Sequence, residues 1–369
     1  MSLTVLHVEA GRHLYGGALQ VRYLIEGLSK RGVINILVCP HGAALGRAVE
    51  PSGAQVHELP MSGELDLGAV GRLRRLIRQV QPDLVHLHSR RGADVFGGVA
   101  ARLCRVPAVV SRRVDNPERA WVARLKYRLF HRVITISQAI REVLVREGVP
   151  ADKVVCVPSA VDVAAYGGAC DGSVLREVLG FSGDETVVGV IAQLIPRKGH
   201  RYLLEAAPRI LQAHPGVRFV FFGQGPQEGE IRELVSRLGL DAHVLLAGFR
   251  DDLPRILPCL DLVVHPVEME GLGVSLLQAG AAGVPMVGAR AGGVPEILGD
   301  DAGLLVPPGD VPALTEAVLC LLDDPDLRRH LGRAARERVS RRFSLDAMVE
   351  GNLAIYREVI GQDARPDGP

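Results

Sequence analysis

The chain has 369 residues, 47% of them hydrophobic, and a formal net charge of only +1. A length of this size exceeds what one hydrophobic core usually organises, so we expect two domains. The apolar runs are shorter than the roughly 20 residues that a membrane-spanning helix needs. The opening segment MSLTVLHVEA lacks the basic start of a secretory signal peptide, and we expect a cytoplasmic protein.

The spacing of the cysteines and the distribution of charge indicate which metal sites, disulfides and partners to expect. The six cysteines are scattered and none has the CxxC or Cys/His spacing of a zinc site, so we expect no metal centre and no disulfide framework. Residues 1–165 hold 23 Lys and Arg against 14 Asp and Glu, a charge of +9, and the remainder holds 20 against 28, a charge of −8. A basic half beside an acidic half indicates two different partners.

Along the first half, short runs of Val, Leu and Ile alternate with amphipathic stretches. The predicted strands are TVLHVEA, INILVC, DLVHLH, PAVVS and RVITIS. The second half repeats the pattern with TVVGVIA, VRFVFFG, HVLLAGF, DLVVHPV and PMVGA, after a Gly-, Ser-, Pro- and Asp-rich break near residues 158–184. Buried strands that alternate with helices predict two doubly wound domains with parallel sheets. Three helices are predicted after them, near residues 311–322, 325–340 and 344–361.

Polar residues that follow strands are the candidates for a site, because ligands of open parallel sheets bind at the carboxyl ends of strands. In the first half, Gly16 and Gly17 open a helix, which favours either an anion site or a simple turn. His86 and His88 share one strand face; His86 fits a hydrogen-bonded core residue, and His88 is the better candidate for the cleft. Arg113 follows the next strand and, being permanently charged, can bind an anion but cannot serve as a general base.

The segment from residue 112 to residue 132 carries the only Trp, Trp121, among many arginines. An interfacial membrane helix and an ordinary surface helix both fit this pattern. The +9 charge gathers here and at Arg90 and Arg91, so we expect an anionic membrane surface or an anionic acceptor as a partner. No nucleic-acid-binding module is recognisable.

In the second half, Arg197 and Lys198 precede a glycine and a predicted helix, a suitable place to counter phosphate charge. The block from residue 267 to residue 298 is more informative. Gly271 and Gly273 permit close approach of the backbone to a ligand, and the helix after them directs free N–H groups at the same point. Glu270 and Gln278 flank this anion site.

The order of these features resembles the donor-site block of the retaining, nucleotide-sugar-dependent glycosyltransferases of family 4, with the GT-B fold. The resemblance covers essentially the whole chain and is most specific over residues 186–306. Gly223-Gln-Gly-Pro226 matches the Gly-x-Gly-Pro of the family. Three positions depart from it: the family commonly has Arg at Gln193, Glu at Gln278 and His at Arg113.

The resemblance implies a role for each site residue. Lys198 and Arg197 would neutralise the leaving diphosphate, Glu270 would orient hydroxyls of the donor sugar, and Gln278 would bind the ribose. The backbone positions implied at the diphosphate are Gly16, Gly17, Gly271, Leu272, Gly273 and Val274. Gly223, Phe249 and Arg250 are implied around the nucleotide. His88 and Arg113 complete the implied catalytic set.

The resemblance also implies an organisation and an activity. Residues 1–165 would form the acceptor-side Rossmann-like domain, residues 166–342 the donor domain facing it across a central cleft, and residues 343–369 a helix that returns to the first domain and a frayed tail. The implied reaction is retaining transfer from a nucleotide-diphosphate sugar, without an obligatory cofactor or metal, to a glycan or glycolipid of cell-envelope or lipopolysaccharide synthesis at the inner face of the membrane. The departures leave open a catalytically weak nucleotide-sugar-binding subunit and, with less support, a nucleotide-sugar epimerase.

Overall fold

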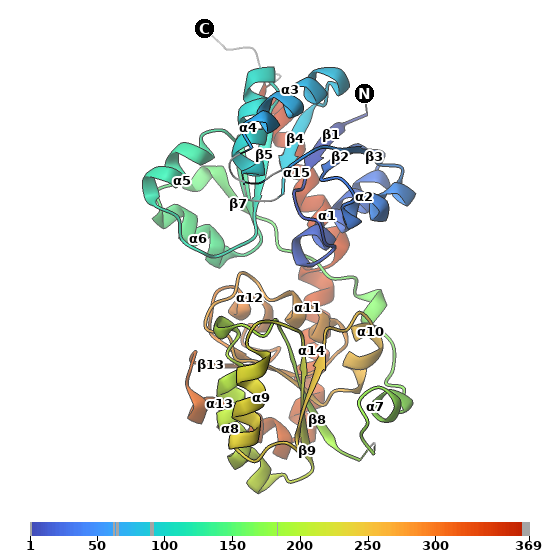
Figure 1. The fold of residues 1–369 in the computed structure, drawn as a ribbon, viewed down its shortest axis with the longest axis vertical. Coiled ribbons are helices and arrows are strands. Elements are labelled where there is room, and N and C mark those ends of the chain that lie inside the picture. Colours follow the sequence, from blue (N-terminus) through green and yellow to red (C-terminus); the bar gives the residue numbers. More distant parts are fainter. Residues whose placement is uncertain (1, 62, 64–65, 89–91, 183, 364–369) are drawn as a thin grey trace. The chain divides into compact units, whose positions relative to one another are not determined.

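The computed structural model describes residues 2–61, 63, 66–88, 92–182 and 184–363. The chain divides into two compact units, drawn in Figure 1. The first unit is Met1–Ala160 together with Leu345–Pro369, and the second is Val161–Ser344. The chain first passes between them inside the Gly-, Ser-, Pro- and Asp-rich stretch at residues 158–184.

The first unit is built on a 7-stranded sheet in the order β3-β2-β1-β4-β5-β6-β7, in which every described strand pair is parallel. Its strands are β1 (Thr4–Val8), β2 (Ile34–Cys39), β3 (Gln55–Glu58), β4 (Leu84–Leu87), β5 (Ala108–Arg112), β6 (Arg132–Thr135) and β7 (Val154–Cys156). Its helices are α1 (Gly16–Ser29), α2 (Ala44–Val49), α3 (Gly68–Val80), α4 (Ala93–Cys104), α5 (Ala120–Tyr127), α6 (Gln138–Arg146) and α15 (Leu345–Asp363). The sheet is buried on both faces, because α3, α4 and α5 pack on one and α1 and α15 on the other.

The second unit repeats this plan with a 6-stranded sheet in the order β10-β9-β8-β11-β12-β13, again parallel throughout its described pairs. Its strands are β8 (Thr186–Ile191), β9 (Val217–Phe222), β10 (Val244–Gly248), β11 (Leu262–His265), β12 (Met286–Ala289) and β13 (Leu304–Val306). Its helices are α7 (Ser173–Glu177), α8 (His200–Ala213), α9 (Glu228–Arg237), α10 (Leu253–Ile256), α11 (Val274–Ala281), α12 (Val294–Leu298), α13 (Val311–Asp323) and α14 (Pro325–Arg342). Residues of α8, α9 and α13 share one hydrophobic cluster with the sheet.

Both sheets reverse their strand order at an equivalent place. In the first unit the reversal lies between β1 and β4, and in the second between β8 and β11. The carboxyl ends of the strands beside such a reversal are where doubly wound sheets bind their ligands. The fold therefore offers one candidate position in each unit.

The predicted fold class is confirmed, and all ten predicted strands are present. The strands β3, β7 and β13 were missed. β7 and β13 have three residues each, and β3 has one hydrophobic residue, Val56, among its four, so each carries too little hydrophobic pattern to separate a strand from a loop. The three predicted C-terminal helices correspond to α13, α14 and α15 within a few residues. Residues 364–369, part of the predicted frayed tail, lie outside the described residues.

One cysteine pair departs from the expectation. Cys170, before α7, and Cys259, in the short helix before β11, form a disulfide inside the second unit. Their separation of 89 residues has no signature in the sequence, and only the fold brings their Cα atoms to 4.7 Å. Cys39, Cys104, Cys156 and Cys320 take no part in a disulfide within the described residues. Among the helices of the described chain, none is both long and apolar enough to cross a membrane.

Candidate functional site

A charged cluster occupies the switch point of the second unit. Lys198, in the short helix Pro196–Lys198 after β8, places its Nζ 2.5 Å from Oε2 of Glu270, in the loop after β11. The same oxygen lies 2.9 Å from Nε2 of His265, the last residue of β11. The other carboxylate oxygen accepts a hydrogen bond from the Gly271 N–H at 3.1 Å. Because both charged side chains are almost buried, with 12% and 13% exposed, this pair is shielded from solvent.

The two loops are held together by close backbone packing at glycines. Gly199 has φ of +69°, and a Cβ there would lie 1.9 Å from the carbonyl oxygen of Pro266. Only glycine lets the Lys198 loop lie this close to the loop that carries Glu270. The Gly292 backbone approaches the Glu270 carbonyl in the same way, with an added Cβ at 1.6 Å. The Gly-Gly turn at residues 292–293 therefore braces the Glu270 loop from its other side.

The protonation states follow from this geometry. Burial by itself would raise the pKa of Glu270, but the hydrogen bond from His265 and the charge of Lys198 outweigh it and hold that pKa well below its ordinary value. Burial lowers the pKa of His265, despite the opposing effect of Glu270. We infer an ionised Glu270 that accepts from a neutral imidazole and from an ammonium. Lys198 uses one of its three N–H donors on Glu270 and keeps two for a ligand.

The helix predicted to begin near Gly273 is α11, and its first residue is Val274. Gly273 has φ of +103°, a left-handed conformation that favours glycine, and no side chain caps the helix within the described residues. The amino end of α11 is therefore available to an anion, beside Glu270. Gln278 lies on the same helix, and its half-buried side chain makes no hydrogen bond to another described residue.

The other residues predicted for the donor site lie in the loops that follow β8, β9 and β10. Arg197 is next to Lys198, and its carbonyl accepts a hydrogen bond from the Glu268 N–H. Gly223 follows β9 with φ of +150°, and a Cβ there would lie 2.0 Å from the carbonyl oxygen of Ala192. Phe249, after β10, is 55% exposed. Arg250 pairs with Asp252 through two hydrogen bonds of 2.7 and 2.5 Å, so its guanidinium is already engaged.

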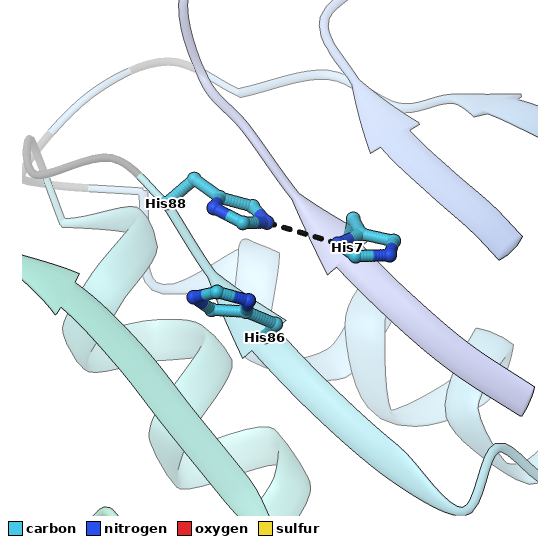
Figure 2. Close-up of side chains that lie close together, drawn as sticks. All are labelled: His7, His86 and His88. Carbon is cyan, nitrogen blue, oxygen red and sulfur yellow. Dashed lines mark hydrogen bonds between the residues drawn. The ribbon is translucent and has the colours of Figure 1, made fainter. Parts of the chain in front are cut away.

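In the first unit, three histidines cluster at the switch point (Figure 2). His7 lies on β1, His86 on β4 and His88 directly after β4, and all three side chains are buried. Nδ1 of His7 lies 2.9 Å from Nε2 of His88. His86 contacts the Tyr356 hydroxyl of α15 at 2.6 Å and the Ser111 hydroxyl at 2.8 Å. The cluster thus holds two hydrogen-bonded groups, His7 with His88 and His86 with Tyr356 and Ser111, whose rings lie side by side.

The tautomers of His7 and His88 can be assigned from Asn35 on β2. The Asn35 Nδ2 group donates to the Val33 carbonyl at 3.0 Å, so its Oδ1 faces Nε2 of His7 and must accept from it. With its proton on Nε2, His7 offers the lone pair of Nδ1, and His88 donates from Nε2. Nδ1 of His88 is then an acceptor, and it is buried without a partner in the described chain.

Burial keeps these imidazoles neutral. It lowers the pKa of His7 to about 4, although the hydrogen bond with Asn35 opposes this shift. It lowers the pKa values of His86 and His88 well below the ordinary value, with smaller contributions from neighbouring histidines and from Arg113. Although the three nitrogen donors lie close enough to hold a metal ion, five of the six ring nitrogens already have hydrogen-bond partners. A cation would also meet the positive charge of Arg113, so the geometry favours the hydrogen-bonded groups.

Arg112 and Arg113 occupy different environments. Arg113 contacts the start of α1, where a Cβ on Gly17 would lie 3.5 Å from its Cδ, and its Nε is buried without a partner in the described chain. Arg112 is only 2% exposed and pairs with Glu118 at 2.9 Å. The expectation that Arg112 belongs to a surface facing a membrane is therefore wrong, because its charge is neutralised inside the unit. Arg90 and Arg91 lie outside the described residues.

The structure thus brings the predicted residues into two groups. Lys198, Glu270 and the amino end of α11 meet in the second unit, and His88, Arg113 and Gly17 meet in the first. Sequence reasoning missed His265, Asn35 and Tyr356, which orient these groups. His265 had a signal, because it ends a predicted strand at the carboxyl edge; Asn35 and Tyr356 had none.

Two Rossmann-like units, each built on a parallel sheet with flanking helices, are the architecture of the GT-B glycosyltransferases. A family model described as glycosyl transferases group 1 matches residues 173–338, and the model for glycosyltransferase family 4 matches residues 15–165. A 2-deoxystreptamine N-acetyl-D-glucosaminyltransferase of Streptomyces fradiae is 30% identical over 320 residues, which cover 80% of this chain and 75% of that protein. The chain belongs to the family 4, group 1 glycosyltransferases and is an enzyme of that class.

The chain is also similar to another glycosyltransferase in sequence and to a solved structure in fold. A UDP-Gal:alpha-D-GlcNAc-diphosphoundecaprenol alpha-1,3-galactosyltransferase of Escherichia coli is 25% identical over 312 residues, 80% of each chain. Among solved structures, the Anabaena protein HepE in complex with UDP has a TM-score of 0.85 at 22% identity, over 96% of this chain and 100% of that one. The structural similarity at this identity establishes the fold.

Proposed function

We propose that the chain transfers a sugar, with retention of the anomeric configuration, from a nucleoside-diphosphate sugar held by the second unit. The observation that carries the proposal is the Lys198–Glu270–His265 cluster beside the uncapped start of α11. Transfer develops negative charge on the departing diphosphate, and fixed donors in a shielded site stabilise such charge most effectively. Lys198 supplies two such N–H donors, and α11 supplies backbone N–H groups.

Glu270 takes a second role in this proposal. An ionised carboxylate accepts hydrogen bonds, so it suits the hydroxyls of a donor sugar. His265 holds it in place by donating from the buried side, and the rigid loop packing at Gly199 and Gly292 keeps it near Lys198. Arg197 adds positive charge at the diphosphate, Gln278 binds the ribose, and Gly223, Phe249 and Arg250 border the nucleotide. The donor is a co-substrate, and the chemistry requires no resident metal.

The first unit supplies the acceptor side. Nδ1 of His88 is an acceptor without a partner in the described chain, and Nε of Arg113 is an equally unpartnered donor. Groups of this kind in a buried site are completed by a ligand or by water. We assign them to polar groups of the acceptor, with Gly16 and Gly17 at the start of α1 beside them.

The acceptor proposed is a glycan or glycolipid of cell-envelope synthesis, lipopolysaccharide included. The relative from Escherichia coli acts on a lipid-diphosphate-linked sugar, and the basic first unit suits an anionic acceptor or membrane surface. Trp121 and Leu125, one helical turn apart on α5, are 66% and 62% exposed and supply apolar contacts for such a surface. The enzyme would then act in the cytoplasm, at the inner face of the membrane.

A donor panel tests the reaction. The purified enzyme is incubated with nucleotide sugars, beginning with UDP-sugars, and release of the free nucleoside diphosphate is measured. We expect turnover of at least one donor, and the transferred sugar should keep its anomeric configuration by NMR. Binding of a nucleotide sugar without any turnover would instead support the weak binding subunit, and an inverted product would refute retention.

A further inference from the structure

A hollow in the first unit lies at the opposite ends of its strands from the histidine cluster. Pro107, His131 and Lys153, which line it, each directly precede one of the neighbouring strands β5, β6 and β7. The hollow therefore lies at the amino ends of parallel strands, whereas Arg113 follows the carboxyl end of β5. The five residues of β5, which span about 16 Å, separate the two sites. The volume of the hollow is about 790 Å³.

Positive charge dominates the lining. The cations are Arg102, Arg105, Arg128, Arg132 and Lys153, against one carboxylate, Asp152. Arg132 is paired with Glu358 of α15. The side chains of Arg102, Arg105 and Arg128 make no ion pair or hydrogen bond within the described chain. Three guanidinium groups thus face one hollow with little internal compensation.

The ends of helices explain part of this charge but not its convergence. Arg102 and Arg105 lie at the carboxyl end of α4, and Arg128 at that of α5, where positive charge complements the helix dipole. A cation near each helix end is enough to complement the helix dipole, so the dipoles do not require the cations to converge on one hollow. Here the cations also repel one another: burial, together with Arg132, Arg102 and Arg128, lowers the pKa of Lys153. An anion in the hollow would relieve this repulsion.

We propose that this hollow is a second anion site, and that its ligand carries a phosphate or diphosphate group. Guanidinium groups match the oxygens of phosphate with paired hydrogen bonds, which favours this class over a simple carboxylate. The source is either a free phosphate compound or the headgroup of a lipid. Trp121 and Leu125 precede Arg128 by seven and three residues on α5, so they share its side of the helix and would enter the interface if the source is a lipid.

The test compares two double variants of the whole chain, both in the Lys198→Ala background so that the cluster of the second unit does not contribute. The pocket variant is Arg102→Gln with Arg128→Gln. The control is Arg47→Gln with Arg78→Gln, which removes the same charge from exposed arginines in the last turns of α2 and α3. Inorganic pyrophosphate is titrated by calorimetry, and vesicles of phosphatidylcholine with or without phosphatidic acid are cosedimented.

We expect the pocket variant to lose at least 10-fold in affinity for pyrophosphate, for phosphatidic acid vesicles or for both, while the control changes less than twofold. A lower affinity of the pocket variant for pyrophosphate would show that the hollow binds a free phosphate compound. A lower affinity for the phosphatidic acid vesicles alone would show that it binds a lipid headgroup. Equal loss in both variants, or no binding of either probe by the Lys198→Ala parent, would overturn the proposal. A lower melting temperature of the pocket variant with unchanged affinities would also overturn it, because the arginines would then serve only their helix ends.

Discussion

The two switch points occupy equivalent positions in two sheets of the same topology, yet their chemistry is opposite. The second unit places an ammonium and a carboxylate 2.5 Å apart, with His265 as a neutral donor. The first unit gathers neutral imidazoles, oriented by Asn35 and Tyr356, and has no carboxylate hydrogen-bonded to the cluster among its described contacts. A charged pair suits the stabilisation of a leaving diphosphate, and neutral acceptors suit hydroxyl groups. The same backbone plan thus supports different chemistry through the few side chains after its central strands.

Removing the ammonium should have the largest effect. Lys198→Ala is expected to lower turnover about 100-fold, or about 3 kcal/mol, because it deletes a preorganised donor to the departing charge. The control is Lys30→Ala, an exposed lysine at the end of α1, which should keep wild-type turnover. The fold is checked by circular dichroism. Activity of the folded Lys198→Ala enzyme within a few-fold of wild type would remove Lys198 from the chemistry.

The neutrality of the first cluster predicts a pH dependence of stability. Burial lowers the pKa of His7 from 6.5 to about 4, so between these values the unfolded chain binds more protons than the folded chain. The free energy of unfolding should therefore fall as pH decreases from 6.5 to 4, by about 3 kcal/mol for this residue. Urea unfolding at several pH values measures it.

His7→Gln should reduce this dependence on pH, whereas His330→Gln, on the exposed side of α14, should keep it. The comparison uses the slope against pH and does not rely on the absolute stability of either variant. A wild-type stability that stays constant from pH 6.5 to 4 would show that the cluster accepts protons in the folded state.

Replacing the carboxylate separates the two proposed roles in the second unit. Glu270→Gln keeps an oxygen that can accept from His265 but loses the charge that holds Lys198 and the sugar hydroxyls. We expect affinity for the donor sugar nucleotide to fall about 10-fold or more, since hydrogen bonds to charged groups contribute about 1.5–3 kcal/mol. Calorimetry should show a smaller loss for the free nucleoside diphosphate, which lacks the sugar. Equal losses for both ligands would contradict the sugar-binding role.

The smallest effect is expected at the ribose. Gln278→Ala should weaken binding of the nucleoside diphosphate by about 1 kcal/mol, roughly fivefold, the net contribution of one ordinary hydrogen bond. Gln278→Glu, the residue usual in the family, should bind at least as well as wild type. If the Ala variant binds like wild type, Gln278 serves only the packing of α11.

Sequence reasoning succeeded where a pattern is local. The hydrophobic runs predicted the strands, and the Gly-rich loop predicted a helix that begins near Gly273, where α11 begins at Val274. It could not show that Lys198 and Glu270 form a pair, because 72 residues separate them. Their loops are joined by tertiary contacts, such as the packing of Gly199 against Pro266, that have no signature in the sequence. The partners of the histidines were equally hidden, since Tyr356 lies 270 residues from His86. The burial of Arg112 and the Cys170–Cys259 disulfide depend on such distant contacts too.

The division of roles between the two clusters is tested most directly by titrating UDP into the wild type, Lys198→Ala and His88→Gln by calorimetry. The glutamine at residue 88 retains an amide that can donate to His7, so the first cluster stays hydrogen-bonded. Our account predicts that Lys198→Ala weakens UDP binding about 10-fold, by loss of a charge-assisted hydrogen bond, and that His88→Gln changes it less than twofold. A loss of UDP affinity in His88→Gln with wild-type affinity in Lys198→Ala would contradict it.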